Sequence, residues 1–575
     1  MRKFLIGVAT GVILTGLTLV ILLFALTIPF RAKAPSITGN SVLVLQLNGE
    51  IPERPPIEVP LGIFGQRSRP TVENVWMLLR KAAADTRIKA VVLEPQSLEI
   101  GWAKLEEIHA DLERFRKSGK PLYAFLKTGG TREYYLATAA TKIYMAPEDQ
   151  LYLKGLRAQV MYFKKTLDKL GVNVQIAHAG KYKDFGDMFT RSDMSPETKE
   201  VLNSVLDDLY GRLVETIAEG RRKSPAEVRA IIDQGPFLAS QAQASGLVDQ
   251  LRFEDQMFGE LEAALRSGEL KKVTTGQYLR VPPSSLGLTG KRRIAFLVGE
   301  GSITQGDPGD DGQSETDITA EGFTKLLRKV RGDSSIDGVV VRIDSPGGEV
   351  VASDAIWREM NLLGRKKPLV ISMSDTAASG GYYIAMTGDP IVSYPGTLTG
   401  SIGVVFGKPD LHGLYDKLGI TKDTLKRGRF ADIDSDYRPL DQTELAKLDQ
   451  GIEASYKDFV GKVAEARHRK YEQIAPVAEG RVWLGSQAQA RGLVDETGGI
   501  DRAIELVKQK AKIPAGEKVS LVVYPARRSI LDWLMPGAMD DALESRVGRL
   551  LKTWQARLAL RGGMLRVMPF VITIE

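Results

Sequence analysis

The chain has 575 residues, of which 26% are charged and 43% hydrophobic, and its formal net charge is +7. This composition is ordinary for a globular protein, the length allows roughly three or four domains, and the small, scattered excess of basic residues does not indicate nucleic-acid binding. Cysteine is absent, which excludes thiol catalysis, structural disulfides and cysteine-ligated metals. Histidine is scarce, which limits serine–histidine chemistry to His109, His178, His412 and His468.

The N-terminal segment is an uncharged apolar run over residues 4–28. It is about as long as the ~20 residues that span a bilayer. A cleaved signal peptide is the alternative, since residues 32–34 (AKA) have the form of a cleavage site. The apolar part of a signal peptide is usually only ~7–15 residues long, however, and Pro35 would follow the cut. We therefore expect a single transmembrane anchor over residues 1–28 and a linker over residues 29–40.

The rest of the chain contains an internal duplication. Residues 237–249 (FLASQAQASGLVD) recur as residues 483–495 (WLGSQAQARGLVD), with an offset of 246. Residues 85–92 (DTRIKAVV) recur as residues 333–340 (DSSIDGVV), with an offset of 248. The two offsets are nearly equal although the matched segments lie far apart in the chain, which indicates two copies of one domain. A repeat of this length is far longer than the repeats of solenoid proteins.

Short apolar strands alternate with amphipathic helices in each copy, which is the pattern of an α/β domain. Helices are expected over residues 75–84, 103–116 and 324–330. We place the first copy at residues 41–278, a linker at 279–290, the second copy at 291–526 and a C-terminal tail at 527–575.

One lysine of the first copy has no counterpart in the second. It lies in residues 179–186 (AGKYKDFG), and the aligned position of the second copy is Gly428 or Arg429. An arginine stays charged and cannot act as a base, whereas a lysine can do so when burial keeps it neutral. Lys183 is therefore a candidate general base, and a surface lysine beside a tyrosine is the plain alternative.

Two segments of the second copy combine an apolar strand with a glycine turn. Residues 339–348 (VVVRIDSPGG) run as a strand into a Gly-Gly turn, and residues 368–371 (PLVI) form a second strand upstream of Ser379. A helix is expected to begin at Tyr382. Ser379 is thus predicted to lie at a strand-to-helix turn among small residues.

Such a turn is the environment that a serine nucleophile and its oxyanion need. Small neighbours admit a substrate backbone, and the N–H groups of Gly380 and of Gly347 or Gly348 could stabilise the oxyanion. The first copy has Thr131 in place of Ser379 and lacks the glycine turns. Only the second copy therefore keeps a candidate nucleophile.

The tail at residues 527–575 has no counterpart in the first copy. An apolar stripe at helical spacing predicts a helical tail, and it consists of Leu543, Val547, Leu550, Trp554 and Leu558. Docking on a neighbouring domain or subunit is the first interpretation, and binding to a membrane surface is the second.

Taken together, these features resemble the signal peptide peptidase A (protease IV) family in its long tandem form. The resemblance rests on the predicted anchor, the two α/β copies and five short motifs, and it covers nearly the whole chain. The motifs are GKYK (180–183), DMSP (193–196), DSPGG (344–348), TAASGGYY (376–383) and TGSIGV (399–404).

The resemblance implies a Clp-protease/crotonase-like (ββα spiral) fold for each copy, and a Ser/Lys dyad. In that family the serine of the SGG motif is the nucleophile, here Ser379, and the second lysine of GKYK is the general base, here Lys183. The serine of TGSIG, here Ser401, is thought to orient the lysine. Residues 184–187 (DFGD) depart from the small apolar run expected there, which affects the shape of the site rather than the dyad.

The resemblance further implies a membrane-anchored serine endopeptidase that cleaves apolar peptides such as signal-peptide remnants and needs no metal or cofactor. It implies a single-pass protein of the cell inner membrane, with its catalytic region on the periplasmic side. A homo-oligomer, most simply a tetramer, is expected, and nucleic acid is not expected as a partner.

Two other functions are compatible with parts of the pattern. A crotonase-type acyl-CoA enzyme would share the core fold and an oxyanion hole of paired N–H groups, but it would need neither Lys183 nor a membrane anchor. A non-catalytic membrane scaffold would be the outcome if both copies had lost activity. Against this, the second copy retains Ser379 and both glycine turns.

Overall fold

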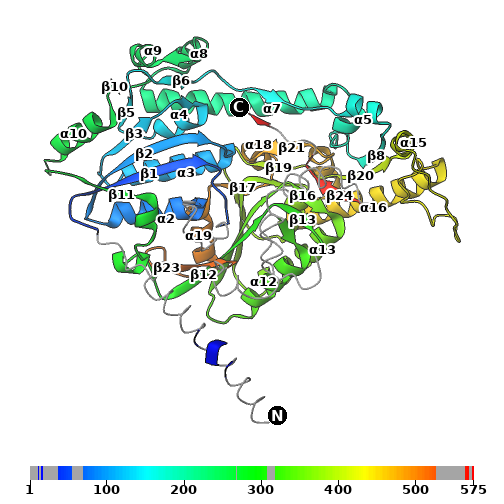
Figure 1. Ribbon diagram of the computed structural model, residues 1–575. Coiled ribbons are helices and arrows are strands. Elements are labelled where there is room, and N and C mark those ends of the chain that lie inside the picture. Colours follow the sequence, from blue (N-terminus) through cyan, green and yellow to red (C-terminus); the bar gives the residue numbers. More distant parts are fainter. Residues whose placement is uncertain are drawn as a thin grey trace.

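The computed structural model describes residues 37–54, 69–266, 268–306, 317–525, 564–568 and 573–574, together with a few positions between 11 and 18. Two α/β units lie against each other (Figure 1). Most of the anchor predicted over residues 4–28 lies outside the described residues. Among those that are described, no helix has the length and apolar character needed to cross a membrane.

The first copy is built on a six-stranded parallel sheet in the order β10-β5-β3-β2-β1-β11. Its strands are β1 (Ser41–Gly49), β2 (Ile88–Leu98), β3 (Leu122–Leu126), β5 (Lys142–Met145), β10 (Gln250–Leu251) and β11 (Lys271–Thr274). A smaller sheet joins β4 (Gly129–Gly130), β6 (Gln150–Tyr152) and β9 (Phe237–Leu238).

The helices of the first copy lie around its sheets (Figure 1). They are α2 (Val72–Ala84), α3 (Trp102–Arg116), α4 (Thr131–Ala137), α5 (Lys164–Leu170), α6 (Asp187–Thr190), α7 (Pro196–Arg221), α8 (Pro225–Ile232), α9 (Ala239–Ala244), α10 (Glu254–Leu265) and α11 (Thr275–Leu279).

The second copy repeats this plan with an eight-stranded sheet along β21-β19-β17-β15-β12-β23, to which β18 and β22 are attached. Its strands are β12 (Arg292–Glu300), β15 (Gly338–Ser345), β17 (Leu369–Ala378), β18 (Ile391–Ser393), β19 (Leu398–Gly400), β21 (Val482–Leu484), β22 (Glu496–Thr497) and β23 (Val519–Tyr524). Its helices are α12 (Ala320–Gly332), α13 (Val350–Gly364), α14 (Gly380–Ile384), α15 (His412–Leu418), α16 (Gln442–Ala466), α17 (Tyr471–Ile474), α18 (Gly485–Ala490) and α19 (Ile500–Lys510).

The duplication predicted from the sequence reappears as duplicated contacts. The Tyr134 hydroxyl donates to the Leu247 carbonyl over 2.8 Å, and the Tyr382 hydroxyl donates to the Leu493 carbonyl over the same distance. Each tyrosine is fully buried, so its hydroxyl needs a partner. The same loop is thereby tied to the same helix in both copies, and the tandem α/β organisation is confirmed.

The predicted helices are present, with boundaries that local capping explains. The helix expected from residue 75 begins instead at Val72, because the Thr71 side chain accepts a hydrogen bond from the Asn74 backbone N–H and forms a capping box. The helix expected from Tyr382 begins two residues earlier, at Gly380.

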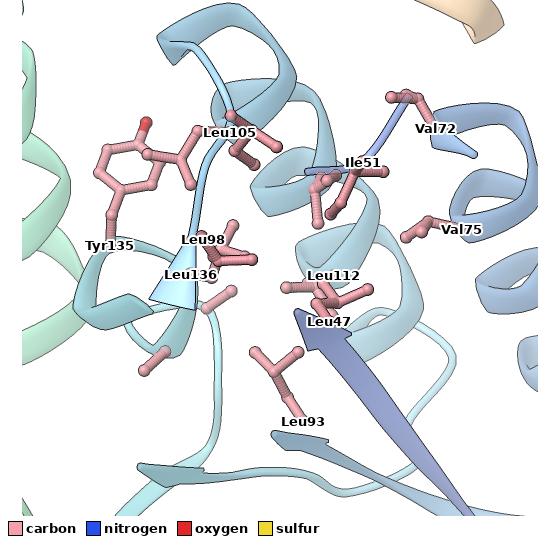
Figure 2. Close-up of a cluster of buried hydrophobic side chains, with 14 of the residues drawn as sticks. Leu47, Ile51, Val72, Val75, Leu93, Leu98, Leu105, Leu112, Tyr135 and Leu136 are labelled. Atoms are coloured by element: carbon pink, nitrogen blue, oxygen red, sulfur yellow. The ribbon is translucent and has the colours of Figure 1, made fainter. Parts of the chain in front are cut away.

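One cluster of buried apolar side chains spans both copies, besides the clusters within each copy. Figure 2 shows part of it, where Leu47 of β1 and Leu93 of β2 lie close to Leu112 of α3. The same cluster of buried side chains continues into the second copy through Phe296 of β12 and Ile500 of α19. Separating the copies would expose this apolar surface to water, which is unfavourable in proportion to its area.

A buried charge also holds the copies together. Arg342 of β15 is completely buried, and its guanidinium donates to Glu53 over 2.8 Å and to Glu107 over 2.6 Å. Both carboxylates belong to the first copy. The guanidinium also donates to the Ser372 hydroxyl over 2.9 Å and to the Ser374 hydroxyl over 3.1 Å. The cost of burying these charges is offset only while all the partners are in place.

A third sheet combines the first copy, the second copy and the tail, in the order β14-β13-β16-β24-β20-β8. Its strands are β8 (Asn173–Ala179), β13 (Ser302–Thr304), β14 (Asp317–Thr319), β16 (Gly347–Glu349), β20 (Val404–Asp410) and β24 (Leu565–Val567). A second tail strand, β25 (Thr573–Ile574), pairs with β7 (Ala158–Gln159) of the first copy.

The tail was predicted to be helical, and this prediction is wrong for the parts of the tail that the structure describes. Leu565–Val567 and Thr573–Ile574 are strands, because open strand edges of both copies supply backbone partners for them. The apolar stripe from Leu543 to Leu558 lies outside the described residues.

Replacing Arg342 by alanine should lower the free energy of unfolding by about 3–5 kcal/mol, because Glu53 and Glu107 would stay buried and would lose the cation that contacts both of them. Arg292→Ala is the control, since that side chain is 56% exposed and pairs with Asp337 at the surface, where a loss below about 1 kcal/mol is expected. Urea titration followed by tryptophan fluorescence measures both. Equal effects of the two substitutions would contradict the role given to the buried charges.

Candidate active site

Ser379 lies at the strand-to-helix turn expected from the sequence, between β17 and α14. Its backbone has φ 54°, an uncommon value for a residue other than glycine. Its N–H donates to the Gly400 carbonyl over 2.8 Å, which helps to hold this conformation. Its side chain is fully buried. Strained backbone of this kind persists only where the surroundings determine it, and it is common at functional sites.

Lys183 reaches this serine from the other copy through the pairing of β8 with β20. The two strands are antiparallel, and Ala179 pairs with Val404 at one end of the ladder. After Ala179 the chain turns: the Lys183 N–H donates to the Gly180 carbonyl over 3.1 Å, and the Tyr182 N–H donates to the Glu479 carbonyl over 2.8 Å. The end of the ladder and this turn together place the lysine beside the serines.

The structure brings three of the predicted residues into direct contact. The Lys183 Nζ atom lies 2.8 Å from the Ser379 Oγ atom, 2.9 Å from the Ser401 Oγ atom and 3.0 Å from the Ser401 carbonyl oxygen. The three residues are fully buried. Ser401 has φ 50°, and its N–H donates to the Arg481 carbonyl over 2.7 Å.

Burial lowers the pKa of Lys183 well below its ordinary value. The neighbouring Asp184 carboxylate opposes this effect, and the guanidinium of Arg566 adds to it. A neutral amine has two N–H donors and one lone pair. The three contacts match these groups: the neutral Lys183 amine can donate to the hydroxyl and the carbonyl of Ser401 and accept from the Ser379 hydroxyl. The lysine is thus placed to take the serine proton.

The glycine turns place two backbone N–H groups beside each other. A Cβ atom on Gly380 would lie 3.0 Å from the Gly348 nitrogen. Gly347 has φ +101°, and its own N–H donates to the Ser345 hydroxyl over 3.2 Å. Of the two glycines that the sequence left open, Gly347 therefore has its N–H engaged, and Gly348, whose nitrogen lies close to Gly380, is the better candidate for the second donor.

Two further glycines at the site were not singled out from the sequence. A Cβ atom on Gly480 would lie 2.6 Å from the Lys183 Cβ atom, and one on Gly403 would lie 3.1 Å from the Lys183 Cδ atom. Gly403 belongs to the TGSIGV motif and could have been noticed. No motif around Gly480 in the sequence marks it as a site residue, because its contact with Lys183 forms only when the chain folds.

The tail was also not expected at the site. The strand β24 lies between β16 and β20 and pairs with both (Figure 1). Its sequence, LRV, is too short to show a strand pattern. The contacts of Arg566 in this strand are described below.

The histidines lie elsewhere. His178, the nearest in sequence to Lys183, is exposed on β8, and its Nδ1 atom lies 3.1 Å from the Gly180 carbonyl oxygen. All four histidines are among the described residues, and none of them is hydrogen-bonded to Ser379. Within the described ranges, no group of three or more histidine, aspartate or glutamate side chains is arranged to hold a metal ion.

Comparison with known proteins shows a relationship over most of the chain. The family model for peptidase family S49 matches twice, at residues 114–267 and 361–514, in agreement with the duplication. The chloroplastic serine protease SPPA of Arabidopsis thaliana is 37% identical over 91% of this chain and 77% of its own length. Protease 4 of Salmonella typhi is 31% identical, with 87% of this chain and 82% of the relative covered. Protease 4 of Haemophilus influenzae is 29% identical, with 83% and 80% covered.

Solved structures align less well. ClpP1 from Listeria monocytogenes is 17% identical and aligns with 36% of this chain and 91% of its own, with a TM-score of 0.22. A TM-score this low carries no conclusion about the fold.

Replacing Gly480 by alanine should displace Lys183, because the new Cβ atom would overlap the backbone and Cβ atom of residue 183 and because φ is +75° at this position. We expect the rate at which a fluorophosphonate labels Ser379 to fall about 100-fold, the effect of misplacing a reacting group by about 1 Å. Gly461→Ala is the control, since a Cβ atom there meets nothing within 4 Å. Undiminished labelling of a folded Gly480→Ala protein would show that the lysine position does not depend on this contact.

Proposed function

The chain belongs to peptidase family S49 and is a serine endopeptidase, and on this premise we propose that Ser379 is its nucleophile and Lys183 its general base. One observation carries the proposal. The Lys183 Nζ atom and the Ser379 Oγ atom are 2.8 Å apart, and both side chains are fully buried. The roles implied by the family resemblance thus have the geometry that they require.

The proposed reaction starts with a proton transfer. Holding a lysine neutral at pH 7, against an ordinary pKa of about 10.4, requires about 4.6 kcal/mol, which burial at the interface of the copies can supply. Neutral Lys183 takes the hydroxyl proton of Ser379, whose Oγ atom then attacks the carbonyl carbon of the substrate. Ser401 holds the lysine amine in place during this transfer.

The negative charge that forms on the substrate oxygen would be stabilised by two backbone donors, the N–H groups of Gly380 and Gly348. Loss of one such donor typically costs about 2.7–4 kcal/mol. Lys183 then gives its proton to the leaving amine, and water hydrolyses the serine ester with the lysine again acting as base. These steps use no metal or cofactor.

We propose apolar peptides such as signal-peptide remnants as substrates. An extended peptide could pair with the glycine turn of β16 and with β20 in the way that the tail strand β24 pairs with both of them. A crotonase-type acyl-CoA enzyme and a non-catalytic scaffold are not favoured. Neither would have a use for a buried lysine hydrogen-bonded to a buried serine.

We further propose that each copy is a Clp-protease/crotonase-like domain. Residues 1–28 would form a single-pass anchor in the cell inner membrane, with the catalytic region on the periplasmic side. The assembly would be a homotetramer, because a two-copy chain with unlike faces can close a ring with other chains. The apolar run at residues 4–28 and the resemblance to the family support these proposals.

The assembly and the anchor can be tested together. A chain lacking residues 1–33 should leave the membrane fraction and sediment as a tetramer, because the interfaces would lie outside the anchor. Analytical ultracentrifugation of that chain, with membrane fractionation of the full chain, provides both measurements. A mature full chain recovered without its N-terminal segment, or a monomeric truncated chain, would contradict the respective proposal.

The dyad predicts a specific set of activities. Ser379→Ala and Lys183→Met should each lower kcat on an apolar reporter peptide by roughly 10⁴-fold or more. His178→Gln should keep most activity, since that side chain is exposed and bonds only within its own loop. An inactive histidine variant alongside an active lysine variant would overturn the assignment of the base.

The pH dependence follows from the lowered pKa of Lys183. The neutral amine is the active form, so kcat/KM should be constant at higher pH and should fall as the pH decreases through that pKa. Because the pKa lies well below the ordinary lysine value, activity should already be present near neutral pH. A profile that rises only as the pH approaches about 10.4 would show that the lysine is not neutral in the folded enzyme.

A further inference from the structure

The C-terminal strand β24 occupies the position in which a peptide substrate would lie. It is antiparallel to β16, with Gly348 paired to Arg566, and antiparallel to β20, with Val405 paired to Leu565. The strand thereby lies between β16 and β20 (Figure 1).

The hydrogen bonds of this ladder identify which carbonyl of the tail faces the glycine donors. The Val350 N–H donates to the Met564 carbonyl over 3.3 Å, and the Met568 N–H donates to the Pro346 carbonyl over 2.8 Å. Hydrogen-bonded pairs alternate with other pairs along an antiparallel ladder. Gly348 and Arg566, midway between these two contacts, are therefore also a hydrogen-bonded pair.

The Arg566 carbonyl also lies near the second donor. Its oxygen lies 2.0 Å, and the Gly380 nitrogen 2.6 Å, from the position that a Cβ atom on Gly347 would take. The carbonyl thus sits beside both N–H groups that we assign to the oxyanion. In a substrate bound along this strand, Arg566 corresponds to the residue that precedes the cleaved bond.

The Arg566 side chain fills a pocket with both aromatic and acidic groups. It is 1% exposed, and its Cζ atom lies 3.7 Å from the centroid of the Tyr383 ring and 5.1 Å from that of Phe459. Its Nη2 atom donates to the Ser455 carbonyl over 3.4 Å and lies 3.6 Å from an Asp458 carboxylate oxygen. Tyr383 is fully buried, so the ring presents a dry face to the guanidinium.

The charges around the pocket favour a cation. The Tyr383 hydroxyl donates its proton to Asp354 over 2.6 Å, and its oxygen lies 3.1 Å from an Asp458 carboxylate oxygen, so both carboxylates lie beside the pocket. Lys462 pairs with both of them, at 3.3 Å and 2.6 Å. Two carboxylates and one ammonium leave one negative charge uncompensated, and the guanidinium of Arg566 supplies the missing positive charge.

The contacts favour arginine over lysine. The Nε and Nη1 atoms of Arg566 have no hydrogen-bond partner among the described residues, so the side chain is held mainly by its stacking on Tyr383. A planar guanidinium stacks on a ring face and is less strongly hydrated than an ammonium. The guanidinium also lowers the pKa of Lys183, so a basic residue in the pocket assists the neutral state of the proposed base.

We propose that the pocket formed by Tyr383, Ser455, Asp458 and Phe459 selects arginine as the residue before the cleaved bond, and that the chain's own Arg566 competes for it. The assignment rests on the proposed function of Ser379. It narrows the substrates to apolar segments that carry a basic residue, a combination found in signal peptides, whose apolar region follows a positively charged one. The tail itself has this character, since apolar side chains flank Arg566 on both sides: Met564, Leu565, Val567 and Met568.

Selectivity is tested with two reporter peptides that differ only in arginine or leucine before the cleaved bond. We expect kcat/KM of the full chain to be at least about 10-fold higher for the arginine peptide, corresponding to one tenfold step in transition-state binding. Asp458→Asn should reduce this ratio several-fold. Asp449→Asn, an exposed carboxylate on the same helix α16, is the matched control and should leave the ratio unchanged.

Competition by the tail is tested with Arg566→Ala and Arg566→Lys. The alanine variant should lower KM for the arginine peptide several-fold because the pocket is vacated, and the lysine variant should lie between it and the unmodified chain. An unchanged KM in the alanine variant would overturn the competition.

The outcomes separate this assignment from the proposed function. Equal or faster cleavage of the leucine peptide, with normal fluorophosphonate labelling of Ser379, would overturn the arginine subsite and leave the dyad intact. Cleavage of neither peptide together with no labelling would overturn the dyad, and the subsite with it.

Discussion

The antiparallel pairing of β8 with β20 is the interaction on which the site depends. It joins one copy of the domain to the other and ends at Ala179, where the chain turns and brings Lys183 to Ser379 and Ser401. A slip of this pairing by one residue would turn the side chains of β8 to the opposite face. The dyad is therefore a property of the pair of copies, and neither copy contains it alone.

The interface that supports this pairing combines two kinds of interaction with different consequences. The shared apolar core makes association favourable without specifying direction, since burial of apolar area is non-directional. The buried Arg342 guanidinium, Glu53 and Glu107 fix how the copies fit together, because these charges are stable in the interior only when they are paired with one another. A rigid interface is also what a buried lysine requires, since any opening would admit water and restore its charge.

Duplication followed by divergence explains how the reacting groups came to be divided between the copies. The contacts that maintain the scaffold, such as those of Tyr134 and Tyr382 with their partner carbonyls, persist in both copies. The polar groups of the site do not. The second copy keeps the serine and the glycine turns, and the first keeps the lysine. Once one composite site exists at the interface, a second set of the same groups is no longer needed.

The sequence by itself determined the duplication, the α/β class, the strand-to-helix turn at Ser379 and the glycine turns, because each of these is a local pattern or a comparison of one copy with the other. With the family resemblance, it also pointed to Lys183 and Ser401. Only the tertiary structure decided that the Gly347 N–H is engaged by Ser345 and that Gly480 must lack a side chain. It alone placed the tail as a strand beside the dyad. Those features depend on strand order and register between segments hundreds of residues apart, and no local periodicity encodes such contacts.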